Sequence, residues 1–190
     1  PNEVFRYCYA DYYKRTCQLA HALKALGVKR GDRVASFALN NHRHLELYFG
    51  VPCYGAVLHT VNIRLPQEHL IHIINHAEDK VLFIDEDLLF LVEPIRDKLT
   101  TVKHIVVLSQ SGTMPATNLS PVYLYDDLLW QQNESYDFPD DLNERDPAVI
   151  CYTSATTGQP KGVVYTHRGI VMHTYGIVAT LGVSESDTAL

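Results

Sequence analysis

The chain has 190 residues, of which 46% are hydrophobic and 20% are charged, and its net charge at pH 7 is −6. These values are typical of one soluble globular domain with a sizeable core, and the negative charge argues against a nucleic-acid partner because no basic stripe offsets it. No apolar run approaches the roughly 18 residues that a membrane helix needs, and no signal peptide is visible.

Helical and strand-like segments alternate along the first half of the chain. In chain order we expect a helix over Asp11–Leu26, a strand over Arg33–Leu39, a helix over His42–Tyr54, a strand over 56–61, a helix starting at Pro66 and a strand over 80–85. Asn40 or Asn41 can cap the second helix, and Pro52 should kink or end it. The third helix carries an apolar stripe made of Leu70, Ile73, Ile74 and Ala77.

The second half continues the alternation with longer polar connections. We expect a helix over Asp87–Lys98 disturbed by Pro94, a strand over 104–108, a polar loop over 109–121, a short strand and helix over 122–132, an irregular acidic stretch over 133–147, a strand over 148–152, and a helix over His167–Thr180 capped by Thr166. The strands are apolar throughout rather than alternating, which favours an α/β fold with a mostly parallel sheet layered with helices on both faces.

The stretch "CYTSATTGQPKGVVYTHRG" (151–169) carries the chemistry. An apolar strand delivers Thr153 to the carboxyl edge of the sheet, where α/β folds commonly bind ligands. Small residues let backbone N–H groups approach a phosphate, hydroxyls add donors, and Lys161 adds a point charge. The segment is not a Walker A loop because Gly162 follows the lysine. Residue chemistry alone leaves an ordinary Ser/Thr-rich turn equally open.

The order of residues in this stretch resembles the signature Tyr-Thr-Ser-Gly-Thr-Thr-Gly-x-Pro-Lys-Gly of the AMP-forming acyl-CoA synthetase and ligase superfamily. Every defined position matches except Ala155. The segments "LAHALKALGVKRGDRVA", "HRHLELYFGVPCYGAVLHTVNIRL" and "INHAEDKVLFID" are also similar to fatty-acid CoA ligases of the medium- and long-chain type. The resemblance extends from about Tyr9 to the end. It implies that residues 1–190 are part of a large N-terminal AMP-binding domain, with the small C-terminal lid domain absent from the chain.

This resemblance implies ATP-dependent activation of a fatty acid to acyl-AMP and then to acyl-CoA, with ATP and Mg²⁺ as cofactors and coenzyme A as co-substrate. Lys161 would be the catalytic cation that counters phosphate charge, and Thr153 would also contact Mg²⁺. The residues expected to bind the cofactor are Thr153, Ser154, Ala155, Thr156, Thr157, Gly158 and Lys161. The adenine, ribose and hinge motifs of the family lie downstream, so we expect the 190-residue piece alone to be inactive.

Other functions remain open at this stage. One is a ligase for a short acid such as a methylthio-alkanoate, another is an adenylating enzyme that passes the acyl group elsewhere, and a third is an incomplete or degenerate nucleotide-binding module without catalysis. Ala155 favours the third, because an alanine costs on the order of 1 kcal/mol where the backbone needs positive φ. The chain starts at Pro1 and stops at "SDTAL", which looks like the start of a strand, so we expect a fragment of a larger protein.

The cysteines and the N-terminal tyrosines bear on the cellular compartment and on a homodimer interface. The four cysteines form no CxxC pair and are expected to be reduced in a cytoplasmic protein, with Cys151 packing rather than reacting. A cluster of tyrosines near the N-terminus leaves a homodimer interface open, although packing is favoured over it. Contact with a membrane surface also stays open. That cluster comprises Tyr7, Tyr9, Tyr12 and Tyr13.

Histidines and a short acidic run complete the candidates. His69, His72 and His76 fall within about a 60° sector of one helix, which can suit a metal, but a solvated helix face is favoured because no carboxylate completes a site. His42 and His44 are expected on the surface. The run 85–87 is expected to end a strand and cap a helix rather than act as an acid/base pair.

Overall fold

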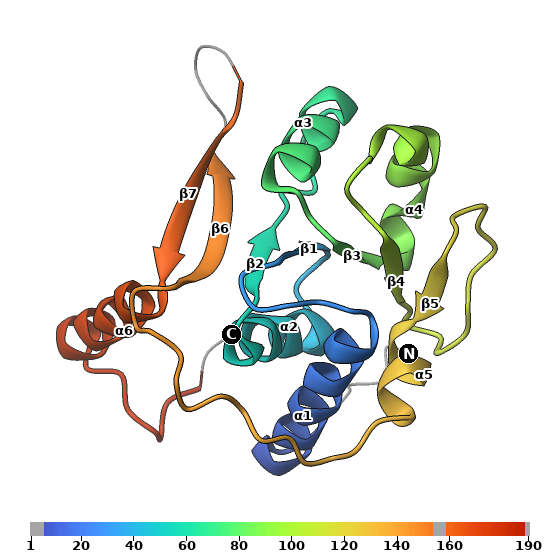
Figure 1. The fold of residues 1–190 in the computed structure, drawn as a ribbon. Coiled ribbons are helices and arrows are strands. Elements are labelled where there is room, and N and C mark those ends of the chain that lie inside the picture. The colour runs from blue at the N-terminus through green and yellow to red at the C-terminus, as the bar shows by residue number, and fades with distance from the viewer. Residues whose placement is uncertain (1–5, 154–158, 189–190) are drawn as a thin grey trace.

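A computed structural model describes residues 6–153 and 159–188 (Figure 1). Its elements in chain order are α1 (Tyr9–Ala25), β1 (Arg33–Phe37), α2 (His42–Tyr54), β2 (Val57–Thr60), α3 (Gln67–Ala77), β3 (Val81–Asp85), the 3₁₀ turn η1 (Glu86–Leu88), α4 (Leu89–Val92), the 3₁₀ helix η2 (Glu93–Lys98), β4 (His104–Leu108), β5 (Val122–Leu124), α5 (Tyr125–Trp130), β6 (Pro147–Thr153), β7 (Lys161–Thr166) and α6 (His167–Leu181). Within the described ranges, no helix is long and apolar enough to cross a membrane.

The strands form one seven-stranded sheet in the order β5-β4-β3-β1-β2-β6-β7. The first six strands pair in parallel, and β7 pairs antiparallel with β6 at the sheet edge. The mostly parallel α/β sheet predicted from the sequence is therefore confirmed. Because parallel neighbours end at the same edge, the chain segments that follow β1, β2, β3 and β6 all gather at the carboxyl edge of the sheet.

Two apolar layers cover the sheet. In β3, Val81 and Phe83 belong to the core cluster under α1, α2 and α5, whereas Leu82 and Ile84 belong to the cluster under α3 and α4. Figure 1 shows the same arrangement, with α3 and α4 on one side of the sheet and α1, α2 and α5 on the other. Burial on both faces explains why the strands read as continuous apolar runs.

The helix boundaries follow the capping residues. Asn41 caps α2 by accepting a hydrogen bond from the His44 backbone N–H at 3.0 Å. The same helix ends at Gly55, which has φ of 98°, a conformation that favours glycine. Thr166 caps α6 through the Gly169 N–H at 3.1 Å. The predicted caps of both helices are thus confirmed, and α2 ends two residues after Pro52.

The segment predicted as a single disturbed helix over Asp87–Lys98 is broken. It divides into η1, α4 and η2, and Pro94 lies in the first turn of η2. Proline cannot donate the backbone hydrogen bond that would continue α4. The chain nevertheless stays helical enough to bury Leu88, Leu89 and Val92 against the sheet.

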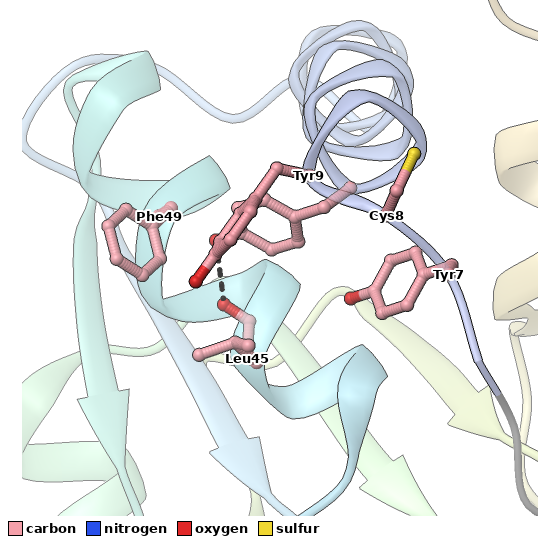
Figure 2. A pocket seen from close by; sticks show the side chains of 6 residues that line it. Tyr7, Cys8, Tyr9, Leu45 and Phe49 are labelled. Atoms are coloured by element: carbon pink, nitrogen blue, oxygen red, sulfur yellow. Dashed lines mark hydrogen bonds between the residues drawn. The ribbon is translucent and has the colours of Figure 1, made fainter. Parts of the chain in front are cut away.

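The tyrosine cluster near the N-terminus is partly packed (Figure 2). The ring of Tyr12 contacts Tyr7 and Phe49 edge-on, with ring centroids 6.1 and 5.7 Å away. Its hydroxyl donates to the Leu45 carbonyl at 3.4 Å. Tyr9 is 90% exposed and lies with these residues around an apolar hollow of about 670 Å³. The predicted packing role is confirmed for Tyr12, while Tyr9 faces solvent.

A network of charged residues joins α1, α2 and α5. The buried Glu46 carboxylate accepts hydrogen bonds from Arg15 Nε at 2.6 Å and from the Tyr125 hydroxyl at 2.7 Å. Arg15 and Arg43 also bind the Asp126 carboxylate, each at 2.8 Å. Burial alone would raise the pKa of Asp126, but the hydrogen bonds from the two arginines lower it overall.

We expect this network to make stability depend on pH through Asp126. A carboxyl group whose pKa is lower in the folded state stabilises the fold above the ordinary aspartate pKa of about 4, and this contribution is lost as pH falls through the folded pKa. The parent should therefore exceed Asp126→Asn in free energy of unfolding at pH 6, with the difference shrinking toward pH 3. Urea unfolding of both proteins across this range measures it, and a difference that is constant with pH would contradict the assignment.

Candidate functional site

The β6–β7 hairpin carries the sequence-predicted loop. The strand β6 lies beside β2 in the parallel sheet and brings Thr153 to the carboxyl edge. The chain then returns through β7, so that Thr153 and Lys161 lie opposite one another at the base of the loop. Both side chains are exposed. The structure therefore brings together two of the predicted site residues. The others, Ser154, Ala155, Thr156, Thr157 and Gly158, lie outside the described residues.

A cleft of about 450 Å³ adjoins this hairpin. Its walls come from the carboxyl ends of β1, β2 and β6 and from α2, which is where parallel sheets commonly hold ligands. The polar side chains on its walls include Asn40, Asn62 and Arg64, all of which are exposed. Cys151 and Tyr152 continue the wall directly into Thr153. The cleft therefore has a mixed polar and apolar lining with a cationic group at Arg64, and it ends one residue before Thr153 at the base of the loop.

Asp85 shapes the sheet edge near this cleft. It ends β3, as predicted, but its carboxylate does not cap the following helical turn. Instead it accepts hydrogen bonds from the Leu39 backbone N–H and from Asn41 Nδ2. Burial raises the pKa of this carboxyl group above its ordinary value. Asp85 thus holds the connection between β1 and α2, which forms part of the cleft wall.

The expectation that His44 lies on the surface is wrong. His44 is 7% exposed, and its ring nitrogens lie 3.1 Å from Ser36 Oγ and 3.2 Å from the Leu39 carbonyl oxygen. Burial lowers the pKa of this imidazole, which favours the neutral ring. The polar residue Ser36 inside an otherwise apolar strand was the signal that a buried partner was needed.

The solvated-face expectation for the three histidines of α3 holds only in part. His76 Nδ1 lies 2.6 Å from the Tyr152 hydroxyl, so this histidine reaches across to β6. In the described part of the chain, no three His, Cys, Asp or Glu residues gather as a group that could hold a metal ion. Of the three histidines, His76 therefore contacts the hairpin.

The predicted packing role of Cys151 is confirmed. Its side chain is half-buried, and Sγ lies 3.1 Å from Thr60 Oγ1 on the neighbouring strand. All four cysteines are free. Cys151 thus helps to fix β6 against β2 immediately before the loop.

Comparisons with known proteins agree with this geometry. Residues 2–190 match the model of a family described as AMP-binding enzyme. A long-chain-fatty-acid–CoA ligase of Thermus thermophilus is 45% identical over 99% of this chain, and a 3-methylmercaptopropionyl-CoA ligase of Ruegeria pomeroyi is 45% identical over 84% of it. The crystal structure of ATP-bound MatB from Rhodopseudomonas palustris is 26% identical and superposes on 90% of this chain with a TM-score of 0.74.

The chain spans only part of these relatives. It covers 33% and 29% of the two ligases and 32% of the MatB chain. The match nevertheless runs along nearly the whole of this chain, from the first helix through the hairpin to α6. The chain therefore belongs to the AMP-binding enzyme family.

Proposed function

We propose that this chain supplies the polyphosphate-binding part of an AMP-forming acyl-CoA ligase that activates a medium- or long-chain fatty acid. The observation that carries the proposal is the family signature at 152–162, placed on a hairpin whose base pairs Thr153 with Lys161 at the carboxyl edge of the sheet. The relative from Thermus thermophilus, named as a long-chain-fatty-acid–CoA ligase, supports the substrate class.

The reaction has two steps. A carboxylate oxygen of the acid attacks the α-phosphorus of ATP, the bond to the β-phosphate oxygen breaks, and pyrophosphate leaves. The thiol of coenzyme A then attacks the acyl carbonyl, and AMP leaves as the thioester forms. The task of this chain is to hold the β- and γ-phosphates in place while charge moves onto the departing pyrophosphate.

Each proposed site residue has a part in holding the phosphates. The Lys161 ammonium lies at the start of β7 and would neutralise phosphate charge. Hydroxyls and backbone N–H groups of Ser154, Thr156, Thr157 and Gly158 would donate hydrogen bonds to phosphate oxygens. The Thr153 hydroxyl would offer an oxygen ligand to Mg²⁺, and the ion would supply additional neutralisation of the phosphate charge. These roles are carried over from the family signature by position, and the chemistry of the residues supports them.

A second candidate substrate is a short sulfur-containing acid. The Ruegeria pomeroyi relative is as similar in identity as the Thermus thermophilus one, and its name gives 3-methylmercaptopropionate as the acid. The test is pyrophosphate release by the intact gene product with ATP, Mg²⁺, coenzyme A and a series of acids from 3-methylthiopropionate to palmitate. Release with octanoate or longer acids supports the main proposal, release confined to the short acid supports the second, and ATP binding without any release contradicts both.

Replacing Ala155 with glycine is expected to tighten ATP binding about fivefold. The family signature has glycine here. Alanine costs about 1 kcal/mol more than glycine where a backbone position needs positive φ, and this free energy corresponds to that factor. Titration of ATP by calorimetry measures the change. Ala116→Gly, in the exposed loop over 109–121, serves as the control for a general effect of added backbone freedom. Unchanged affinity in Ala155→Gly would show that the alanine is harmless to phosphate binding.

A further inference from the structure

A buried histidine–aspartate pair lies inside the sheet face that α3 covers. His59 of β2 and Asp79, just before β3, are both fully buried, and His59 Nδ1 lies 2.7 Å from Asp79 Oδ2. Among the described residues, neither His59 Nε2 nor Asp79 Oδ1 has a hydrogen-bond partner. Burial raises the pKa of the Asp79 carboxyl group, opposed by the contact with His59. Such a pair is costly in an apolar layer, so stability alone is a weak reason for its presence.

The ring of Tyr152 packs beside His59 of this pair. In the parallel register of β2 and β6, His59 pairs with Ile150, so Tyr152 lies two residues further along on the same face. The ring centroids of His59 and Tyr152 are 5.0 Å apart. The hydroxyl of Tyr152 lies 2.6 Å from His76 Nδ1 on α3. Tyr152 therefore contacts the buried pair through the His59 ring and contacts α3 through the hydrogen bond between its hydroxyl and His76.

The other side of the hairpin leaves room for this ring. Tyr152 pairs with Gly162 across β6 and β7. A Cβ atom at Gly162 would lie 3.2 Å from Tyr152 Cζ and 2.9 Å from Ile150 Cδ1, which is closer than such contacts normally come. The next pair along the hairpin is Thr153 with Lys161, the base of the phosphate loop. The position of the Tyr152 ring is thereby tied to the position of that base.

We propose that His59, Asp79, Tyr152 and His76 form a positioning unit that fixes the base of the phosphate loop against α3. The proposal rests on the proposed function insofar as it assigns ATP phosphates to this loop. Catalysis by phosphate positioning needs donors held to within a fraction of an ångström. The edge strand β7 has β6 as its one strand neighbour, so the position of Lys161 on β7 depends on the position of β6, which the contacts of Tyr152 fix. All four act through Thr153 and Lys161 rather than by touching substrate.

The first arm of the test measures amide hydrogen exchange in the intact gene product. Tyr152→Phe keeps the ring and removes the hydroxyl, and His76→Ala removes its partner. Both should speed exchange at the amides of Thr153, Lys161 and Gly162 by about three- to tenfold, because the hairpin loses its tie to α3. His76→Gln restores a hydrogen-bonding group and should return exchange toward the parent rate. His69→Ala, on the same helix, is the matched control and should leave these amides unchanged.

The second arm measures ATP affinity for the same variants. Tyr152→Phe and His76→Ala should each weaken ATP binding about fivefold, and the double variant should be no weaker than either single one, because both remove the same hydrogen bond. Additive losses, or losses equal to that of His69→Ala, would overturn the proposal. If the parent binds no ATP, the proposed function fails. The hydrogen-exchange measurement still tests the positioning unit in that case. Unchanged exchange in Tyr152→Phe would by itself reject the positioning unit.

Discussion

Replacing Glu46 with alanine should lower the free energy of unfolding by about 3–5 kcal/mol, the loss typical of breaking a buried ion pair from one side. Glu46 is fully buried, and its two carboxylate oxygens accept from Arg15 and from the Tyr125 hydroxyl. Removing the carboxylate leaves the fully buried Tyr125 hydroxyl without its acceptor, while Arg15 keeps its hydrogen bond to Asp126. Because α1, α2 and α5 meet through this group, the whole helical layer should loosen.

Urea-induced unfolding of the intact gene product checks this expectation. The matched control is Glu134→Ala, since Glu134 also binds a cation, Lys14 at 3.1 Å, but on the surface where both side chains are more than half exposed. Surface pairs of this kind contribute at most about 1 kcal/mol. Equal losses in the two variants would show that the Glu46 network adds no more than a surface ion pair.

Replacing Lys161 with alanine should weaken ATP binding by about 10- to 100-fold and slow acyl-adenylate formation by at least as much. Hydrogen bonds to charged groups contribute about 1.5–3 kcal/mol, which corresponds to this range of affinity. Lys161 is exposed at the first position of β7, so its loss should leave the fold intact. Affinity measured by calorimetry and adenylate formation measured in a single turnover report the two effects separately.

A lysine at the opposite edge of the sheet provides the control. Lys103 is exposed just before β4, at the amino ends of the parallel strands. Lys103→Ala removes the same charge from the protein without touching the hairpin, so it should change ATP affinity less than twofold. If both lysine variants lose ATP affinity equally, the loss comes from the change in net charge, and the specific role of Lys161 is contradicted.

Strand burial and helix starts were predictable because each depends on residues that are close together in the sequence. Apolar strands without alternation predict a sheet buried on both faces, and caps such as Asn41 and Thr166 mark helix starts. The break of the fourth helical segment was signalled by Pro94, although its division into 3₁₀ and α turns depends on how Leu88, Leu89 and Val92 meet the sheet.

The long-range contacts could not be predicted from a single sequence. Nothing near His76 indicates that it meets Tyr152, which is 76 positions away, and Glu46 reaches Tyr125 over 79 positions. The loop itself was found because its signature is contiguous. The residues proposed to support it were missed because they come from β2, α3 and the connection between α3 and β3. The local sign of the buried pair was a polar histidine, His59, within the apolar strand "VLHT". This sign does not indicate that the partner is Asp79.

The measurement that tests the central claim most directly is carboxylate-dependent exchange of labelled pyrophosphate into ATP by the intact gene product. This exchange reports reversible acyl-adenylate formation and needs the phosphate loop to hold both pyrophosphate and ATP. We predict exchange that requires a fatty acid of medium or long chain and disappears in Lys161→Ala. Exchange that is absent with every carboxylate, in a protein that binds ATP, would contradict the claim that this chain belongs to an acid-activating ligase.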